Sequence, residues 1–151
     1  SVIYGQSIDK TLDQLDIENK KEIKFKLEET LKPIEEFKLK LQEEYKKNGY
    51  ITNHFGRIIY PEKEFALLNN FIQSTATDYF IIKLEKLFNL LDNINNRIVL
   101  QNHDSVLLNL RVKDIEETTL IEDIKETLES KEEGLFGKVS LKYSENWSDL
   151  N

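Results

Sequence analysis

The residues with the clearest chemical potential are Asn102, His103 and Asp104, which interrupt two apolar runs of strand character. The pattern predicts two paired strands, with a carboxylate and an imidazole at or near the tight turn that joins them. A sheet fixes the position of such a turn while the turn exposes its side chains, so this arrangement can hold a catalytic carboxylate rigidly. Asn and Asp also occur in turns for conformational reasons alone, and the motif by itself does not separate the two explanations.

A second set of polar side chains lies upstream, in a segment that is otherwise apolar. Asn69, Gln73 and Thr77 recur every four positions, so on a helix they form one polar stripe. A solvent-exposed face explains such a stripe as well as a binding face does. A stripe that converges with His103 and Asp104 favours binding, because a module without a ligand has no reason to aim these groups at one place.

The composition is that of a globular chain with an acidic balance. Hydrophobic residues make up 39% and charged residues 32%, and the formal net charge is −7. Binding of nucleic acid through bulk electrostatics needs a basic patch, so a nucleic-acid role must rest on a few placed residues or on other parts of a larger protein. The absence of cysteine excludes disulfides and Cys-based zinc sites. We expect no membrane partner and no secretion, since the sequence shows neither a long apolar run nor a signal-peptide pattern.

The spacing of the apolar residues predicts the elements that position these groups. Helical patterns cover residues 6–31, 33–48, 62–91 and 114–130, with Pro33 separating the first two helical stretches. Asn48-Gly49 predicts a C-terminal helix cap. Strand patterns cover residues 50–60 (two short strands around Gly56), the hairpin at 97–110, and 138–143. The sequence therefore predicts an α+β fold, in which helices are followed by a small antiparallel sheet packed on long helices.

Four short motifs resemble those of family A DNA polymerases, the group of bacterial DNA polymerase I and many phage replicases. Tyr4-Gly5 resembles the Tyr-Gly that closes the nucleotide-binding helix of the fingers. Residues 48–52 and 55–57, Asn-Gly-Tyr-Ile-Thr and Phe-Gly-Arg, resemble the segment that leads back to the palm. Residues 73–78, Gln-Ser-Thr-Ala-Thr-Asp, are similar to the helix motif Gln-Gly-Thr-Ala-Ala-Asp. Residues 101–104, Gln-Asn-His-Asp, resemble the palm hairpin motif Gln-Val-His-Asp-Glu.

The resemblance implies how the chain is organised. Residues 1–48 would be the carboxy-terminal part of the fingers subdomain, and residues 49–151 the carboxy-terminal part of the palm, with its catalytic hairpin. The chain is then expected to be a carboxy-terminal fragment of a DNA-directed DNA polymerase. We expect it to be inactive without the missing amino-terminal portion, on the same or a separate chain. The implied location is the cytoplasm of a bacterium or of a phage-infected cell.

The resemblance also implies the chemistry and the roles of individual residues. Asp104 would be the catalytic carboxylate and metal ligand, one of two aspartates that hold two Mg²⁺ ions for nucleotidyl transfer. The implied partners are primer-template DNA and deoxynucleoside triphosphates. The other implied roles belong to Asn69, Gln73, Gln101 and His103 at the minor groove of the primer-template, to Tyr4 and Gly5 at the nascent base pair, and to Arg57 at a backbone phosphate.

The end of the chain and one motif position need separate mention. Trp147 stands where the family often ends in a Trp-containing strand, whereas Ser105 stands where most members have Glu. His-Asp-Ser also occurs in single-subunit RNA polymerases, so a fragment of such an enzyme is an alternative, although the motif at 73–78 favours the DNA enzymes. A non-catalytic helical interaction module is the other alternative, because the acidic amphipathic helices alone would support it.

Overall fold

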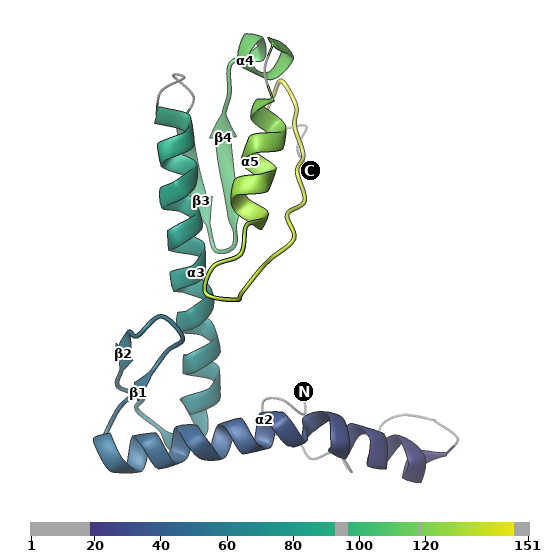
Figure 1. The fold of residues 1–151 in the computed structure, drawn as a ribbon, viewed down its shortest axis with the longest axis vertical. Helices are drawn as coiled ribbons and strands as arrows, with labels where there is room; N and C mark the ends of the chain where they lie inside the picture. The colour runs from purple at the N-terminus through teal and green to yellow at the C-terminus, as the bar shows by residue number, and fades with distance from the viewer. Residues whose placement is uncertain (1–18, 93–96, 118, 147–151) are drawn as a thin grey trace. The chain divides into compact units, whose positions relative to one another are not determined.

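The computed structural model describes residues 19–92, 97–117 and 119–146. They divide into two compact units, up to Thr75 and from Ala76 onward, and each unit is described by itself. Along the chain the elements are α2 (Lys20–Asn48), β1 (Ile51–Thr52), β2 (Ile58–Ile59), the 3-10 helix η2 (Glu64–Ala66), α3 (Leu67–Asp92), β3 (Arg97–Asn102), β4 (Ser105–Asn109), α4 (Val112–Glu117) and α5 (Leu120–Glu129) (Figure 1). Helices dominate and the strands form two small antiparallel sheets, which confirms the predicted α+β class.

The first unit has a small apolar core formed by α2, the β1–β2 hairpin and the start of α3. The buried side chains are Leu41, Ile51, Leu67 and Leu68, and partly buried Ile34, Phe37, Tyr45, Ile59 and Phe71 pack against them. The ring of Phe37 on α2 meets the ring of Phe71 on α3 edge to face, with centroids 4.9 Å apart. This cluster fixes the end of α2 against the beginning of α3.

Two glycines make the turns that the sequence predicts in this unit. Gly49 ends α2 with a φ of 77°, and its N–H donates to the carbonyl of Tyr45 at 2.8 Å. Gly56 lies between β1 and β2 with a φ of 84°. Both angles are in the left-handed region that favours glycine, and the predicted helix cap and short hairpin are confirmed.

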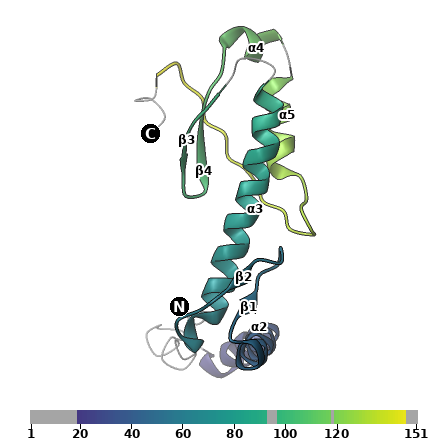
Figure 2. The ribbon, with the colours of Figure 1, turned by 90° about the vertical axis from the view of Figure 1, so that its left-hand side faces the viewer.

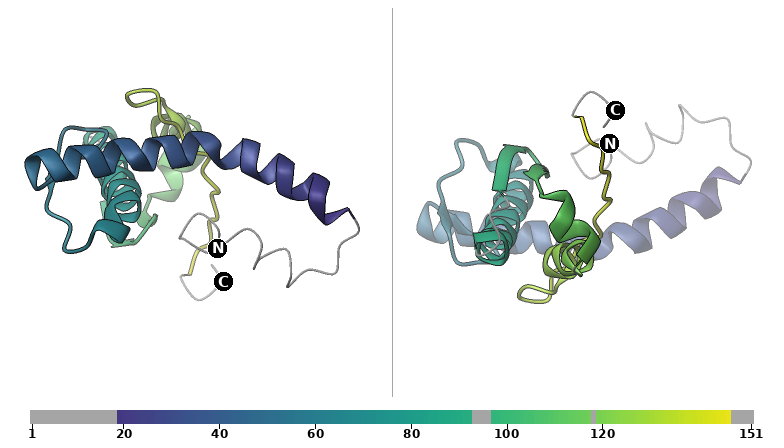
Figure 3. Two further views of the ribbon diagram at one scale, coloured as in Figure 1. Left: turned by 90° about the horizontal axis from the view of Figure 1, so that it is seen from below. Right: turned by 90° about the horizontal axis from the view of Figure 1, so that it is seen from above.

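Helix α2 is continuous from Lys20 to Asn48, so the break predicted at Pro33 is wrong (Figure 3). A proline in a helix interior removes one backbone hydrogen bond and costs about 3 kcal/mol. Tertiary packing offsets this cost, because Ile34, Phe37 and Leu41 all belong to the core of the first unit. The packing of the side chains that follow Pro33 therefore outweighs the tendency of this proline to break the helix.

The second unit places the β3–β4 hairpin and α5 along the C-terminal part of α3 (Figures 1 and 2). Its buried core combines residues of the two helices, Leu87, Leu91, Leu120, Ile124 and Leu128, and the hairpin packs Ile98, Val106 and Leu108 against them. Strand β3 pairs antiparallel with β4, which confirms the hairpin predicted at residues 97–110. One face of the hairpin is thus anchored on two helices.

Two predicted elements near the C-terminus differ from the structure. The single helix predicted at 114–130 is two helices, α4 and α5. Thr119 is the N-cap residue of α5, and its hydroxyl donates to the carboxylate of Asp123 at 2.8 Å rather than capping a backbone N–H. The strand predicted at 138–143 is extended chain without strand pairing in the described part of the protein. There the backbone N–H of Val139 donates to the carboxylate of Glu129 at 3.0 Å, in place of a ladder partner.

Some predictions fall at or beyond the limits of the described residues. Residues 6–18 of the first predicted helical stretch lie outside them, as do Tyr4, Gly5 and Trp147. The helix predicted from residue 62 is preceded by η2 and begins at Leu67.

None of the described helices is long and apolar enough to cross a membrane.

Candidate functional site

The two-residue turn of the β3–β4 hairpin presents His103 and Asp104. Asn102 and Ser105 pair with each other on either side of the turn, and both turn side chains are exposed. His103 has a φ of 51°, a left-handed conformation that is uncommon outside glycine. The short turn therefore fixes the backbone position of Asp104, while its carboxylate stays exposed to solvent.

Side chains on both strands brace this turn. The hydroxyl of Ser105 donates to the carbonyl of Asn102 at 2.8 Å, and Nε2 of Gln101 donates to the carbonyl of His103 at 3.4 Å. Ser105, at the position where the resemblance implies a glutamate, closes the turn and adds no second carboxylate. The turn offers Asp104 as its carboxylate.

A β-bulge in β3 determines the face of the hairpin on which Gln101 lies. Ile98 pairs with Leu108 and Leu100 pairs with Leu107, so Val99 is an extra residue without its own partner. Side chains alternate along a regular strand, and the extra residue reverses this alternation. Gln101, which pairs with Val106, therefore shares the helix-facing side of the hairpin with Ile98, and Asn102 shares the opposite side with Leu100.

An exposed carboxylate at a rigid turn has the donor chemistry that Mg²⁺ prefers, because it is a hard oxygen ligand. Across residues 19–92, 97–117 and 119–146, no three His, Cys, Asp or Glu side chains gather into a group that could hold a metal ion. Asp104 fits the role of one ligand, and a complete site needs further carboxylates beside it.

A second exposed group, Arg57, is carried by the loop between β1 and β2. Asn53 is 5% exposed and organises this loop: its Oδ1 accepts from the backbone N–H of Phe55 at 3.0 Å and of Arg57 at 2.9 Å. The loop is also tied to α3, where the N–H of His54 donates to the buried hydroxyl of Thr75 at 3.3 Å. Asn side chains stabilise turns in this way, so the backbone that carries Arg57 is held in a defined position.

The polar stripe predicted at Asn69, Gln73 and Thr77 lies on α3. Gln73 and Thr77 are exposed and Asn69 is partly buried. Asn69 and Gln73 belong to the first unit, whereas His103 and Asp104 belong to the second. Their predicted convergence on one ligand therefore stays a prediction.

A buried lysine is the feature that the sequence interpretation missed. Lys83 on α3 is 1% exposed. Its ammonium donates to Oγ of Ser130 at 2.6 Å, to Oε1 of Glu132 at 2.8 Å, to the carbonyl of Thr127 at 3.3 Å, and to the carbonyl of Ser130. The ring of Tyr79 lies 5.2 Å from the same nitrogen. Such a set of partners is what a buried charge needs, because an unpaired one is strongly destabilising.

The sequence does contain a signal for this burial. Lys83 stands four residues before Leu87 and eight before Leu91, both of them core residues of the second unit. Residues at this spacing share one helix face. A lysine in register with an apolar stripe predicts either a solvated edge or a buried cation with partners, and the structure shows the second.

Glu132 is held between two lysines. Its Oε1 accepts from Lys83 at 2.8 Å and from Lys86 at 2.5 Å. These hydrogen bonds, first from Lys83 and then from Lys86, lower the pKa of Glu132 from 4.5 to about 2. A lowered carboxyl pKa contributes stability above the unfolded-state value and loses it as the pH falls from about 4.5 toward about 2. Glu132 is therefore ionised throughout the neutral range.

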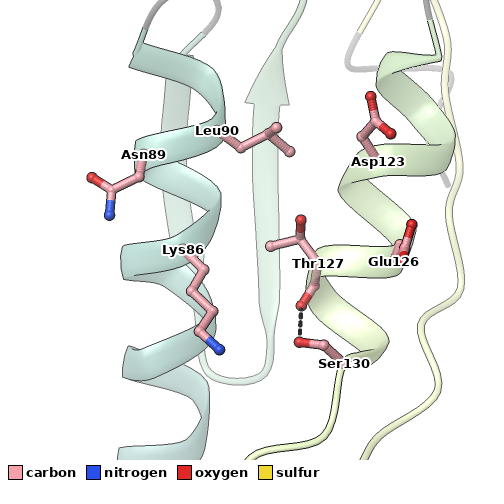
Figure 4. Close-up of a pocket in the computed structure, with 7 residues that line it drawn as sticks. All are labelled: Lys86, Asn89, Leu90, Asp123, Glu126, Thr127 and Ser130. Carbon is pink, nitrogen blue, oxygen red and sulfur yellow. Dashed lines mark hydrogen bonds between the residues drawn. The ribbon is translucent and has the colours of Figure 1, made fainter.

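A shallow groove runs between α3 and α5 beside these lysines (Figure 4). Its lining consists of Lys86, Asn89 and Leu90 from α3 and of Asp123, Glu126, Thr127 and Ser130 from α5 and its end. The groove is open and mixes one cation with two carboxylates, unlike the mostly apolar, enclosed pockets that bind small molecules. None of the predicted site residues that the structure describes lines it.

Comparison with known proteins gives two findings. The family model described as DNA polymerase family A matches residues 1–149. The fold is similar to a solved structure of the POL domain of Pol1 from M. smegmatis in complex with DNA primer-template and dNTP, with a TM-score of 0.62 and 23% sequence identity. The similarity covers 83% of this chain and 25% of that chain, so this chain spans about a quarter of the length of the polymerase it matches.

Proposed function

The chain belongs to DNA polymerase family A, and we propose that it forms the carboxy-terminal part of the catalytic domain of a DNA-directed DNA polymerase. The observation that carries this proposal is the exposed carboxylate of Asp104 on a braced two-residue turn. We assign residues 1–48 to the fingers and 49–151 to the palm. The remaining palm and the thumb would come from an amino-terminal portion on the same or a separate chain, in the cytoplasm of a bacterium or of a phage-infected cell.

Asp104 contributes a fixed negative charge in this proposal. Two Mg²⁺ ions, when bound, would stabilise the charge on the attacking and leaving oxygens of nucleotidyl transfer. Because the turn has only two residues and Ser105 donates to Asn102 across it, the carboxylate needs little reorganisation when charge develops. A second aspartate would be supplied by the palm segment of the amino-terminal portion.

The proposed contacts to DNA need no basic surface. Purine N3 and pyrimidine O2 offer acceptors in the minor groove whatever the sequence, and the amides of Gln73 and Gln101 can donate to them. A mispair displaces these acceptors, so such contacts test the shape of the primer terminus. The other proposed contacts are Asn69 and His103 at the same groove, Arg57 at a backbone phosphate, and Tyr4 and Gly5 at the nascent base pair.

Nucleotide choice by the complete polymerase tests the proposal against its alternatives. We expect extension of a primed DNA template with deoxynucleoside triphosphates and Mg²⁺, and loss of extension when the metal is chelated. Unprimed synthesis with ribonucleotides would instead indicate a single-subunit RNA polymerase, which the match to the DNA polymerase family disfavours. No incorporation of either nucleotide would favour a non-catalytic helical interaction module.

Replacing Gln73 with Ala should weaken primer handling modestly. One neutral hydrogen bond is worth roughly 0.5–1.5 kcal/mol net, so we expect an effect of about three- to tenfold on DNA binding or extension. The ratio of extension from matched and mismatched primer ends should change as well. Asn89→Ala, which removes an exposed amide from α3 away from the polar stripe, is the control in the same assays. Equal matched-to-mismatched ratios for Gln73→Ala and the unmodified enzyme would remove Gln73 from the minor groove.

A further inference from the structure

The C-terminal end of α5 is held by two side chains, one from its own segment and one from another helix. Helices leave their last carbonyls without intrahelical partners, and a left-handed residue after the end often satisfies them. Here the C-cap residue Ser130 has φ −59° and ψ 149°, which is not left-handed. The hydroxyl of Ser130 donates to the carbonyl of Thr127 at 2.8 Å (Figure 4). Lys83, from α3, donates to the carbonyls of both Thr127 and Ser130. A cation at this end also interacts favourably with the helix dipole, so Lys83 caps α5 from another helix.

The capped end of α5 lies at the same end of the second unit as the hairpin turn. In two perpendicular views the turn of β3–β4 and the last turn of α5 stand at one level along α3 (Figures 1 and 2). Leu128, next to Thr127, belongs to the core cluster against which Val106 packs. Val106 is two residues from Asp104 along β4. Leu128, at the capped end of α5, and Val106, beside the hairpin turn, thus belong to one packed core.

We propose that Lys83 is a positioning residue for Asp104, acting by fixing α5 against the hairpin. The proposal rests on the polymerase function proposed above. Removing the ammonium takes one donor from the carbonyl of Thr127, which keeps the Ser130 hydroxyl, and the lysine donor from the carbonyl of Ser130. Both carbonyls lie in a partly buried place, where poorly satisfied acceptors are costly. The end of α5 then loosens, and the hairpin face that packs on it loses its fixed support.

Lys86 provides a matched control. It lies on the same helix and binds the same carboxylate, Glu132, at 2.5 Å, but it is 46% exposed and donates to that carboxylate rather than to a carbonyl of α5. Lys83→Met and Lys86→Met each remove one ammonium from Glu132, and Lys83→Met alone also removes the donor that reaches the carbonyls of Thr127 and Ser130 from α3.

The experiment compares both variants in the complete polymerase at a temperature where each is folded. Single-turnover incorporation is measured against Mg²⁺ concentration, and hydrogen exchange is measured at residues 97–109, with residues 51–59 as the internal reference. For Lys83→Met we expect an incorporation rate about tenfold or more lower, since small misplacements of reacting groups have effects of this size. We also expect a several-fold higher Mg²⁺ concentration at half-saturation and faster exchange in the β3–β4 hairpin alone. Lys86→Met should match the unmodified enzyme in rate and exchange.

The outcomes separate this inference from the proposed function. A Lys83→Met enzyme with a lower Tm but unchanged rate, Mg²⁺ dependence and hairpin exchange would show that Lys83 only stabilises the fold. If Lys83→Met does not fold, Ser130→Ala serves as the second variant, because it removes the hydroxyl that lies 2.6 Å from Nζ and donates to the carbonyl of Thr127. It must shift the same quantities in the same direction, and no shift overturns the inference. Absence of incorporation by the unmodified enzyme would contradict the polymerase function itself.

Discussion

Replacing Asp104 with alanine in the complete polymerase should lower the single-turnover incorporation rate by about three orders of magnitude or more. The carboxylate is proposed to hold metal ions as charge develops in the transition state, and losing about 4 kcal/mol of such stabilisation corresponds to roughly a thousandfold in rate. The dissociation constant for primer-template should stay within about threefold of normal, because a contact made mainly in the transition state contributes little to ground-state binding.

The control for this prediction is Glu116→Ala. Glu116 is an exposed carboxylate on α4, so its removal changes the net charge by the same amount without touching the hairpin turn. We expect a rate within about twofold of the unmodified enzyme, as for most surface substitutions. Near-normal turnover in Asp104→Ala would remove the assignment of Asp104 as a metal ligand.

The isolated chain should show no primer extension at any Mg²⁺ concentration. Two-metal catalysis needs ions clamped on both the attacking and the leaving oxygen, and the described residues offer no group of three acidic, His or Cys side chains that could hold an ion. A circular dichroism spectrum that shows helical content would verify that the chain is folded in the assay. Robust extension by the folded, isolated chain would contradict the proposed division of the active site.

The sequence predicts correctly those elements for which the turn residues and the spacing of the apolar residues indicate the same structure. Gly49 provides the left-handed cap that the helix before it needs, and the apolar runs around His103 and Asp104 form the expected hairpin. In each case a turn residue stands between segments of clear periodicity, so pattern and geometry favour the same structure. The exposure of Asp104 follows from the same pattern.

Features that depend on contacts between distant residues could not be predicted in this way. The helix continues through Pro33 because core packing resumes at Ile34. The bulge at Val99 changes the face on which Gln101 lies, although its residues read as a regular strand. Lys83 finds partners more than forty residues later, at Ser130 and Glu132. None of these features has a decisive local sequence signature. From the sequence alone, Pro33 predicts a helix break, residues 97–102 predict a regular strand, and Lys83 predicts a solvent-exposed side chain.

Reconstitution of primer extension is the most direct test of the central claim that this chain supplies one carboxylate of a shared polymerase site. Single-turnover incorporation is measured in three parallel reactions with Mg²⁺, primed template and the amino-terminal portion of the polymerase: without this chain, with this chain, and with its Asp104→Ala variant. We predict incorporation in the second reaction and almost none in the other two. Equal incorporation in all three, or in the second and third, would contradict the account.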